Sequence, residues 1–365
     1  MHMSWIKSEK FKEIILIFSV SIILLLLVDN FLGYALLKSA PISSRNNAER
    51  GIRISHPVYH HTLSANYDGL ARNQSEYRFC TNPDGLKSKC GEKNEHKNYD
   101  IGFLGDSFTE GLGLPYEKTF VGLIADALPG KKIANLGVVS YSPTIYHLKL
   151  KDFLDRGYKF KELVVYIDIS DIQDEVNYAV VNGKVVDTIK STQKEKMFPL
   201  LNFGLKGLRD RLEMIFYPDS RKESRGLNGP IYRRDYRRGA WTFDSGDEGY
   251  GKIGVKGAID KSLAMMEKLY DLCEKNKIKL SVSVYPWPGQ ILYDVEESMQ
   301  VKIWREFCVG KCANFYNSFP TFFGLAGVSG KEEVIKTHFF YDDMHFNESG
   351  NKLIASDFLR GYKGR

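Results

Sequence analysis

Ile101-Gly-Phe-Leu-Gly105-Asp106-Ser107-Phe-Thr-Glu110 is the stretch of this 365-residue chain that decides its fold. The apolar run 101–104 has the length and composition of a buried parallel strand. The Gly-Asp-Ser turn that follows lifts the hydroxyl of Ser107 out at the carboxyl end of that strand. A serine hydroxyl is a weak nucleophile until a base takes its proton, and a carboxylate must orient that base. The stretch therefore predicts a nucleophilic Ser107 whose base and acid come from elsewhere in the chain.

A second motif supplies candidates for both groups. Asp342-Asp343-Met344-His345 contains a histidine that can act as the base and two aspartates that can orient it. Asn347 and Glu348 follow, and they are typical of a helix start. An isolated Gly-Asp-Ser could be an ordinary turn. This interpretation is the weaker one here, because a strand precedes the motif and an Asp-x-x-His follows later in the chain.

These two motifs resemble the first and last blocks of the SGNH (GDSL) hydrolase superfamily. In that family Gly-Asp-Ser carries the nucleophile, and Asp-x-x-His carries the acid and the histidine. The widespread spacing implies that Asp342, three residues before His345, is the acid, and this is the residue that we expect. Some membrane-associated acyl-modifying relatives use an acid two residues before the histidine, which would select Asp343.

The two middle blocks of the family match less closely. The segment 135–143 follows an expected strand and has Ser140 where the family usually has glycine. The segment 163–171 has Ser170 where the family usually has asparagine. The resemblance implies an oxyanion hole made by the backbone N–H groups of Ser107 and Ser140 and by the side chain of Ser170. A serine hydroxyl is shorter than an asparagine amide, and loss of one oxyanion donor costs roughly 10²- to 10³-fold in rate.

Strand and helix patterns alternate from residue 98 onward, which is typical of a three-layer α/β/α sandwich with a mostly parallel sheet. The resemblance implies the same architecture, SGNH-type and flavodoxin-like. The expected strands end at residue 104 or cover 132–136, 162–167 and 279–285. The expected helices cover 117–128, 144–154, 258–274, 296–307 and the segment after 347. Ser107, Ser140 and Ser170 each follow an expected strand, and sites in such sheets lie at the carboxyl ends of the strands.

Residues 14–28 are almost purely apolar, and apolar character resumes over 31–37 after Asp29 and Asn30. About 24 residues make a helix of about 36 Å, which is long enough to cross a bilayer with some tilt. Lysines precede the run, so the positive-inside rule places the amino terminus in the cytoplasm and the remainder outside it. We expect an uncleaved single-pass anchor with the catalytic domain in the periplasm or otherwise outside the cytoplasm. A cleaved signal peptide is the rival interpretation, and a buried helix of a soluble enzyme is a weaker one.

The expected organisation is a cytoplasmic tip and anchor over 1–40, a small β-rich extension over 41–97, and a hydrolase-like domain over 98–365. An insertion interrupts this domain at about 177–252. It contains arginines interleaved with tyrosines over 232–241, which could bind an anionic glycan or a lipid head group or could simply be solvated. Of the five cysteines, two pairs could form disulfides, Cys80 with Cys90 and Cys308 with Cys312. Cys273 would be left over, and disulfides would fit an oxidising compartment.

Composition and motifs together predict the function. Apolar content of 43% favours a packed globule, and a net charge of +6 carries no signal for nucleic acid. We expect a serine esterase that removes an acyl group, acetyl above all, from a cell-envelope polysaccharide through an acyl-enzyme. An O-acyltransferase would use the same residues, and a non-catalytic carbohydrate-binding or polysaccharide-assembly subunit is the contrasting class. No metal or organic cofactor is required. The side chains expected to contact substrate are Asp106, Asp171 and Trp287.

Overall fold

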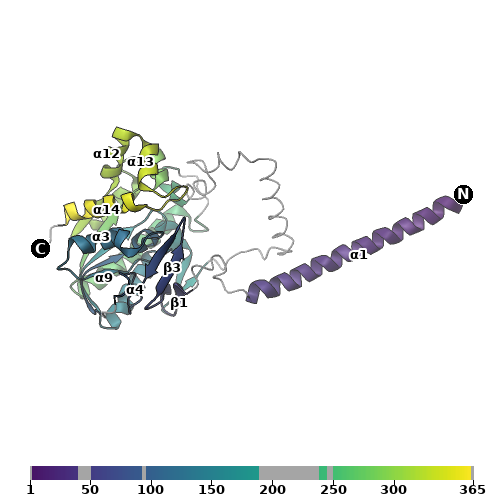
Figure 1. The fold of residues 1–365 in the computed structure, drawn as a ribbon, viewed down its shortest axis with the longest axis horizontal. Coiled ribbons are helices and arrows are strands. Elements are labelled where there is room, and N and C mark those ends of the chain that lie inside the picture. Colours follow the sequence, from purple (N-terminus) through teal and green to yellow (C-terminus); the bar gives the residue numbers. More distant parts are fainter. Residues whose placement is uncertain (1, 40–50, 93–95, 189–237, 245–249, 363–365) are drawn as a thin grey trace. The chain divides into compact units, whose positions relative to one another are not determined.

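The computed structural model describes residues 2–39, 51–92, 96–188, 238–244 and 250–362. The chain divides into two compact units, one formed by Met1–Asn47 with Ile189–Lys222 and the other by Ala48–Thr188 with Glu223–Arg365. In the first unit the described residues form one helix, α1 (His2–Ser39), purple in Figure 1. Its segment Lys10–Asp29 has a mean hydropathy of 2.6, and its apolar side chains are exposed. By length and composition this helix could cross a membrane.

The second unit contains a five-stranded parallel sheet, which includes the four strands that the sequence predicts. Its strands are β5 (Asn98–Leu104), β6 (Ile133–Asn135), β7 (Lys159–Ile167), β10 (Lys279–Val284) and β11 (Asn314–Asn317). They lie in the order β11-β10-β7-β5-β6, and each pairs in parallel with its neighbours. In chain order this is 2-1-3-4-5, the flavodoxin-like arrangement, whose topological switch point lies between β5 and β7.

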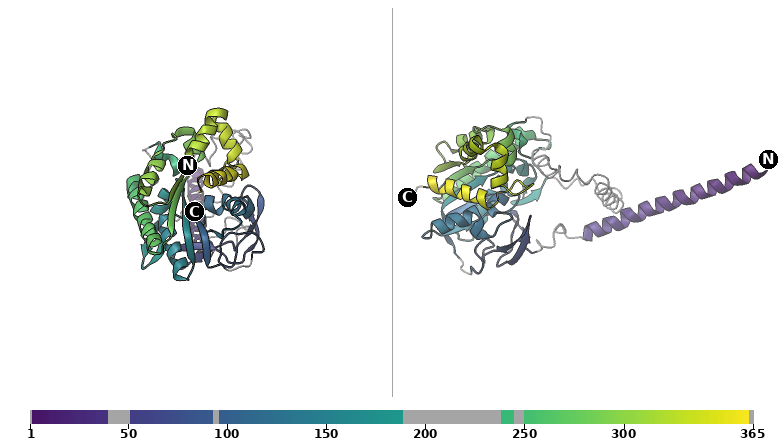
Figure 2. Two further views of the ribbon diagram at one scale, coloured as in Figure 1. Left: turned by 90° about the vertical axis from the view of Figure 1, so that its left-hand side faces the viewer. Right: turned by 45° about the horizontal axis from the view of Figure 1, so that its top comes forward.

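Helices cover both faces of this sheet. α3 (Phe120–Ala127) packs against α14 (Glu348–Gly361) on one face, and α4 (Pro143–Asp155) packs against α9 (Gly254–Lys275) on the other (Figures 1 and 2). The central strand β7 is consequently buried from Leu163 to Ile167 without alternation, as expected for a strand covered on both sides. The predicted three-layer α/β/α fold is confirmed.

Two antiparallel hairpins precede the sheet. β1 (Arg53–His56) pairs with β2 (His60–Leu63), and β3 (Asp68–Arg72) pairs with β4 (Glu76–Cys80). Cys80 and Cys90 form a disulfide just after them. Phe79 and Leu86 from this segment are buried in the same apolar core as the sheet. The β-rich extension therefore packs as part of the α/β unit.

A buried lysine joins this extension to the segment that follows the nucleophile. The ammonium of Lys87 donates hydrogen bonds to the carbonyl oxygens of Gly111 (2.8 Å) and Leu114 (2.6 Å). Burial lowers the pKa of Lys87 to about 7. The two carbonyls and the aromatic rings of Tyr77 and Phe79 surround this amine in place of water.

Only the edges of the expected insertion can be described. After α5 (Asp171–Val176), the strands β8 (Tyr178–Val181) and β9 (Lys184–Asp187) form a hairpin. A short 3₁₀ turn, η3 (Ala240–Thr242), precedes α9. Residues 189–237, which contain most of the arginines and tyrosines singled out above, lie outside the described residues.

Most expected elements agree with the structure to within a few residues, whereas several short ones were not expected. The expected helix over 117–128 is a 3₁₀ turn, η2 (Tyr116–Lys118), followed by α3. The elements that the patterns did not predict include α2 (Ser107–Glu110), α5, β8, β9, α10 (Pro288–Tyr293), β11, α12 (Phe319–Ser329) and α13 (Lys331–His338). α11 (Met299–Cys308) ends at the second disulfide, Cys308–Cys312, and Cys273 is buried as a free thiol.

Gly137, just beyond β6, provides a test of this packing. A Cβ added there would lie 2.6 Å from the backbone nitrogen of Glu110 and 2.6 Å from Cβ of Thr109. Backbone cannot move aside cheaply, so Gly137→Ala should destabilise the fold by about 1–3 kcal/mol or more. Gly130→Ala is the matched control, because a Cβ at Gly130 has nothing within 4 Å. Urea unfolding should show a lower midpoint for the first variant alone, and equal midpoints would contradict the close approach.

Candidate active site

Ser107, His345 and Asp343 form a hydrogen-bonded relay at the carboxyl end of the sheet. Nε2 of His345 lies 2.8 Å from Oγ of Ser107, and Nδ1 of His345 lies 2.6 Å from Oδ1 of Asp343. The serine follows β5, whereas the other two residues lie in the turn before α14. A hydroxyl, an imidazole and a carboxylate in this order are the arrangement in which the imidazole can take the serine proton.

The structure corrects the expected acid, because Asp343 and not Asp342 contacts the imidazole. The segment before His345 is a turn, in which Oδ1 of Asp343 also accepts the backbone N–H of His345 at 3.0 Å. An aspartate that accepts the N–H two residues ahead is held in an Asx turn, and this turn places the carboxylate beside the ring. Asp342 has left-handed backbone geometry, with a φ of 53°.

The Asp343 carboxylate is held in its charged form. Burial raises the pKa of Asp343, but the charge of His345 and hydrogen bonds from His345 and Asn73 outweigh this effect. The resulting pKa is about 2. The Asn73 amide comes from the N-terminal extension and donates to Oδ2 at 3.2 Å. An acid that stays ionised can stabilise an imidazolium as it forms.

Asp106 shapes the turn that presents the nucleophile. It caps α2, and its Oδ1 accepts the backbone N–H of Phe108 at 2.9 Å. Its Oδ2 lies 3.3 Å from Oγ of Ser107. Ser107 therefore has two acceptors within reach, the imidazole of His345 and the carboxyl of Asp106.

Ser140 adopts the backbone conformation for which glycine is usually chosen. Its φ is 60°, in the left-handed region, which costs a non-glycine residue about 1–2 kcal/mol. The loop is held in place from several sides. The Val139 N–H donates to Oε2 of Glu110 at 3.0 Å, and the Tyr178 hydroxyl donates to the Ser140 carbonyl at 2.9 Å. His61 contacts the Val139 carbonyl through Nε2 at 2.7 Å.

Ser170 lines the same cavity as the nucleophile. Its backbone N–H donates to Oδ1 of Asp168 at 2.5 Å. The part that its side chain would take in the oxyanion hole stays a prediction.

A cavity of about 300 Å³ opens beside Ser107 and His345. Ser140, Ser170, Asp106 and Asp343 line it, together with the side chains Asn73, Leu112, Val139, Asp174, Arg238, Trp287 and Met344. Trp287 was expected to offer a ring face to a sugar. Instead it is 3% exposed, stacks on Phe108, and donates its indole N–H to Asp168. It forms part of the wall and is not an open platform.

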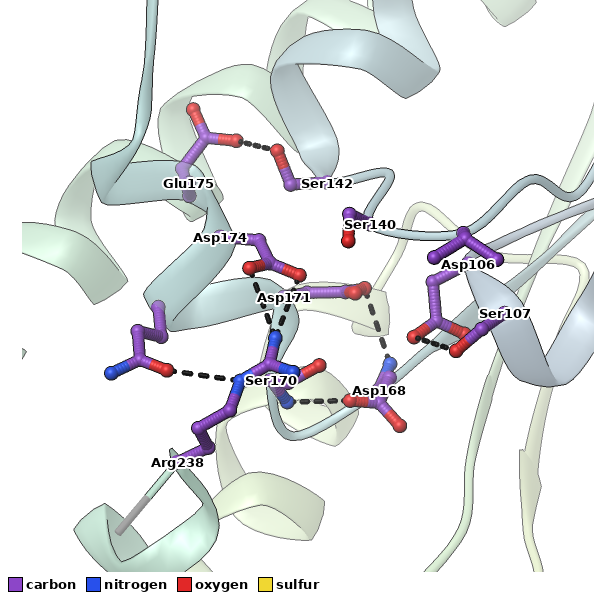
Figure 3. Close-up of polar contacts among 12 residues, drawn as sticks. Asp106, Ser107, Ser140, Ser142, Asp168, Ser170, Asp171, Asp174, Glu175 and Arg238 are labelled. Carbon is purple, nitrogen blue, oxygen red and sulfur yellow. Dashed lines mark hydrogen bonds and ion pairs between the residues drawn. The ribbon is translucent and has the colours of Figure 1, made fainter. Parts of the chain in front are cut away.

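Asp171, also expected to contact substrate, is fully buried and lies behind the wall of the cavity. Its Oδ2 accepts hydrogen bonds from the Tyr146 hydroxyl at 2.7 Å and from the backbone N–H of Asp168 at 3.1 Å. Figure 3 shows the Asp171 carboxylate pointing toward Asp106. Its observed role is to organise the loop after β7.

Two groups of described side chains have the spacing of a metal site. In the first, with Asp68, Cys80 and Cys90, the two cysteines are joined as a disulfide and offer no thiolate. In the second, Asp106, Asp168 and Asp171 bring buried carboxylates within 4.8 Å of one another. Asp168 already accepts bonds from Ser170, Trp287 and Tyr285.

Several residues of the site carry no motif in the sequence. Asn73 and Arg53 come from the extension, and Arg53 forms an ion pair with Glu110, the residue that anchors the Val139 N–H. Arg238 bonds Gln173 through Nε at 3.0 Å and Asp174 through Nη2 at 2.9 Å (Figure 3). The interleaved arginines drew attention to the segment 232–241, but spacing alone did not indicate that one of them lines the cavity.

The two neighbouring aspartates should differ sharply when each is replaced by asparagine. Asp343→Asn should lower kcat for an aryl acetate by up to about 10⁴-fold with little change in KM, because the imidazole loses its charged partner. Asp342→Asn is the matched control. It should cost roughly tenfold or less, since asparagine tolerates left-handed geometry. Steady-state kinetics of the full chain in detergent would measure both, and a severe Asp342→Asn with a mild Asp343→Asn would reverse the assignment.

No protein-family model and no curated protein matches the chain. Solved structures that resemble it include a member of the lipolytic protein G-D-S-L family from Veillonella parvula, at 12% identity over 73% of this chain and 99% of that one, with a TM-score of 0.41. They also include an acetylxylan esterase from Geobacillus stearothermophilus, at 11% identity over 73% of this chain and 95% of that one, with a TM-score of 0.41. An esterase from a Pseudoalteromonas species matches at 12% identity over 73% and 96%, TM-score 0.37. The flavodoxin-like sheet, the Gly-Asp-Ser turn after its first strand and the contact between His345 and Ser107 are the arrangement that the resemblance to the SGNH hydrolase superfamily implies.

Proposed function

We propose that this protein is a serine esterase that removes an ester-linked acyl group, acetyl in the first instance, from a cell-envelope polysaccharide outside the cytoplasm. The observation that carries the proposal is the relay from Ser107 Oγ through His345 to Asp343, with contacts of 2.8 Å and 2.6 Å. All three side chains line one cavity, so an ester bound there would meet the nucleophile directly.

The proposed reaction has two halves. Ser107 Oγ attacks the ester carbonyl while Nε2 of His345 takes its proton, and the imidazolium then gives that proton to the leaving sugar oxygen. In the second half, water attacks the acyl-enzyme and loses a proton to His345. The imidazolium then returns this proton to Ser107 Oγ as the free carboxylic acid leaves. The backbone N–H groups of Ser107 and Ser140 would stabilise the oxyanion.

The cavity favours a short acyl group on a polar partner. Its volume of about 300 Å³ lies at the small end of the range for ligand pockets. Leu112, Val139 and Met344 give it apolar surface, whereas most of its other lining side chains are polar or charged. Acetyl esters of carbohydrates combine a small apolar group with many hydroxyls, which matches this lining.

O-acyl transfer to a sugar hydroxyl is the second candidate, and the position of the acid favours it. Asp343 lies two residues before His345, which is the spacing that the resemblance associates with membrane-bound acyl-modifying relatives. The same acyl-enzyme serves both reactions, so the difference depends on whether water or a hydroxyl reaches it. A non-catalytic carbohydrate-binding subunit would need neither the relay nor an ionised Asp343.

Replacement of the nucleophile tests the shared step. Ser107→Ala in the full chain should abolish both covalent labelling by a serine-directed phosphonate and the release of nitrophenol from an aryl acetate. Its unfolding free energy should change by only about 1 kcal/mol, because the buried hydroxyl makes a hydrogen bond to His345 or Asp106 but fills little space. Ser349→Ala, in an exposed serine at the start of α14, is the control and should label normally. Persistent turnover by a folded Ser107→Ala protein would exclude the acyl-enzyme, and an acetylated oligosaccharide product with an acceptor present would identify transfer.

The location depends on α1, which we propose to be an uncleaved membrane anchor. The apolar segment Lys10–Asp29 and the two disulfides of the α/β unit both fit a catalytic domain in an oxidising compartment. An alkaline phosphatase fused after residue 45 should be active in a bacterial host and remain with the membrane fraction. An inactive fusion would overturn the topology, and release of a shortened protein into the soluble fraction would indicate a cleaved signal peptide instead.

A further inference from the structure

Three aspartates come together directly behind the nucleophile. Asp106, Asp168 and Asp171 are each 2% exposed or less, and carboxylate oxygens from the three lie within 4.8 Å of one another (Figure 3). Like charges this close in a dry setting do not all ionise, because each disfavours the charge of the others and water is absent to screen them.

The hydrogen-bond donors around this cluster are unevenly distributed. Asp168 is the best supplied, since it accepts the Ser170 N–H, the Trp287 indole N–H and the Tyr285 hydroxyl. Asp171 receives both of its donors on Oδ2. Its Oδ1 is buried and has no hydrogen-bond partner among the described residues. A buried carboxylate oxygen without a donor is costly, so this oxygen indicates a missing hydrogen.

A proton fits that position better than a cation does. Hard cations in proteins bind to about six oxygen ligands or more. Here the oxygens of Asp168 and Oδ2 of Asp171 already accept hydrogen bonds, and Oδ1 of Asp106 is committed to the Phe108 N–H. A single proton needs only two oxygens that face each other. The Asp171 carboxylate points toward Asp106, so the pair can share one (Figure 3).

We propose that Asp106 and Asp171 share one proton in the working enzyme and so carry one negative charge between them, beside Ser107. Burial first, and then the neighbouring aspartates, raise the pKa of both carboxyls well above the ordinary value. The other charged or titratable groups that face the pair are Asp174 with its partner Arg238, Tyr146 from α4 and Tyr285 after β10.

The consequence for catalysis follows from the two acceptors near Ser107. The hydroxyl has one proton and can give it either to His345 Nε2 at 2.8 Å or to Asp106 Oδ2 at 3.3 Å. A fully ionised Asp106 would compete for that proton, and its charge would repel the developing oxyanion. The shared proton makes Asp106 a weaker hydrogen-bond acceptor, so the Ser107 hydroxyl donates to Nε2 of His345. Asp171 is thus a positioning residue that acts through Asp106.

The proposal rests on the proposed esterase function, and its main test is the pH dependence of that activity. In the full chain, kcat/KM for an aryl acetate should fall about tenfold or more on the alkaline side of its pH profile, as the pair loses its proton and gains a second charge. Asp171→Asn places a permanent N–H donor against Asp106 and fixes the pair at one charge. This alkaline decline should therefore disappear in Asp171→Asn, and it should also disappear in Asp106→Asn.

Asp357→Asn is the matched control. Asp357 is a partly buried carboxyl on α14 that accepts a bond from Thr321, and burial raises its pKa as well. This variant should keep the wild-type alkaline decline. An unchanged decline in Asp171→Asn would overturn the shared proton while leaving the esterase assignment intact. If the serine-directed phosphonate does not label the wild type and the wild type does not hydrolyse the aryl acetate, the result counts against the esterase assignment instead.

Two measurements do not depend on activity. Infrared spectra should contain the C=O stretch of a buried protonated carboxyl that moves on labelling with ¹³C-aspartate and is absent from Asp171→Asn. A native state that holds an extra proton loses stability as pH rises above the ordinary aspartate pKa. Asp171→Asn should therefore gain in Tm relative to the wild type as pH increases. The absence of the band, or a Tm difference that does not change with pH, would each contradict the proposal.

Discussion

The hydrogen bond between His345 and Ser107 joins groups that are 238 positions apart in the chain. No local structure can bring them together, so the site exists only when the sheet and its helices have formed. β5 carries the serine turn and lies between β7 and β6 in the sheet. α14 packs against α3 on one face, which holds the turn with His345 over the end of β5. A contact of 2.8 Å at this point demands that β5, α3 and α14 be correctly placed together.

The loops at the carboxyl ends of neighbouring strands each supply a different part of the candidate site. The turn after β5 supplies the nucleophile, the loop after β6 supplies the Ser140 N–H, and the loop after β7 supplies the aspartates that accompany Asp106. Glu110 connects the first two, because it lies in α2 with Ser107 and accepts the N–H of Val139. The candidate nucleophile and the loop that would form one side of the proposed oxyanion hole are thereby connected through one buried carboxylate.

Strands with a continuous apolar run and residues in a short motif were predictable from the sequence. The buried runs of β5, β7 and β10 indicated parallel strands, and Gly-Asp-Ser with the later histidine indicated the relay. β11 was missed because it has only four residues, of which only Tyr316 is fully buried, so that its pattern is no stronger than that of a loop. The choice between Asp342 and Asp343 was wrong for a different reason. It depends on an Asx turn, whereas the family spacing carries no information about the backbone geometry of this segment.

The role of the N-terminal extension could not have been predicted either, since its contacts are long-range and involve common residue types. Asn73 bonds the acid of the relay, Arg53 pairs with Glu110, and His61 holds the Val139 carbonyl. Ser140 pays a conformational penalty that glycine would avoid, and an isolated loop would relax out of that geometry. The contacts from the extension oppose this relaxation, so they let a serine stand at the position where relatives keep a glycine. The hairpins before the sheet therefore support the candidate site, because without them neither Asp343 nor the loop at Ser140 has its full set of partners.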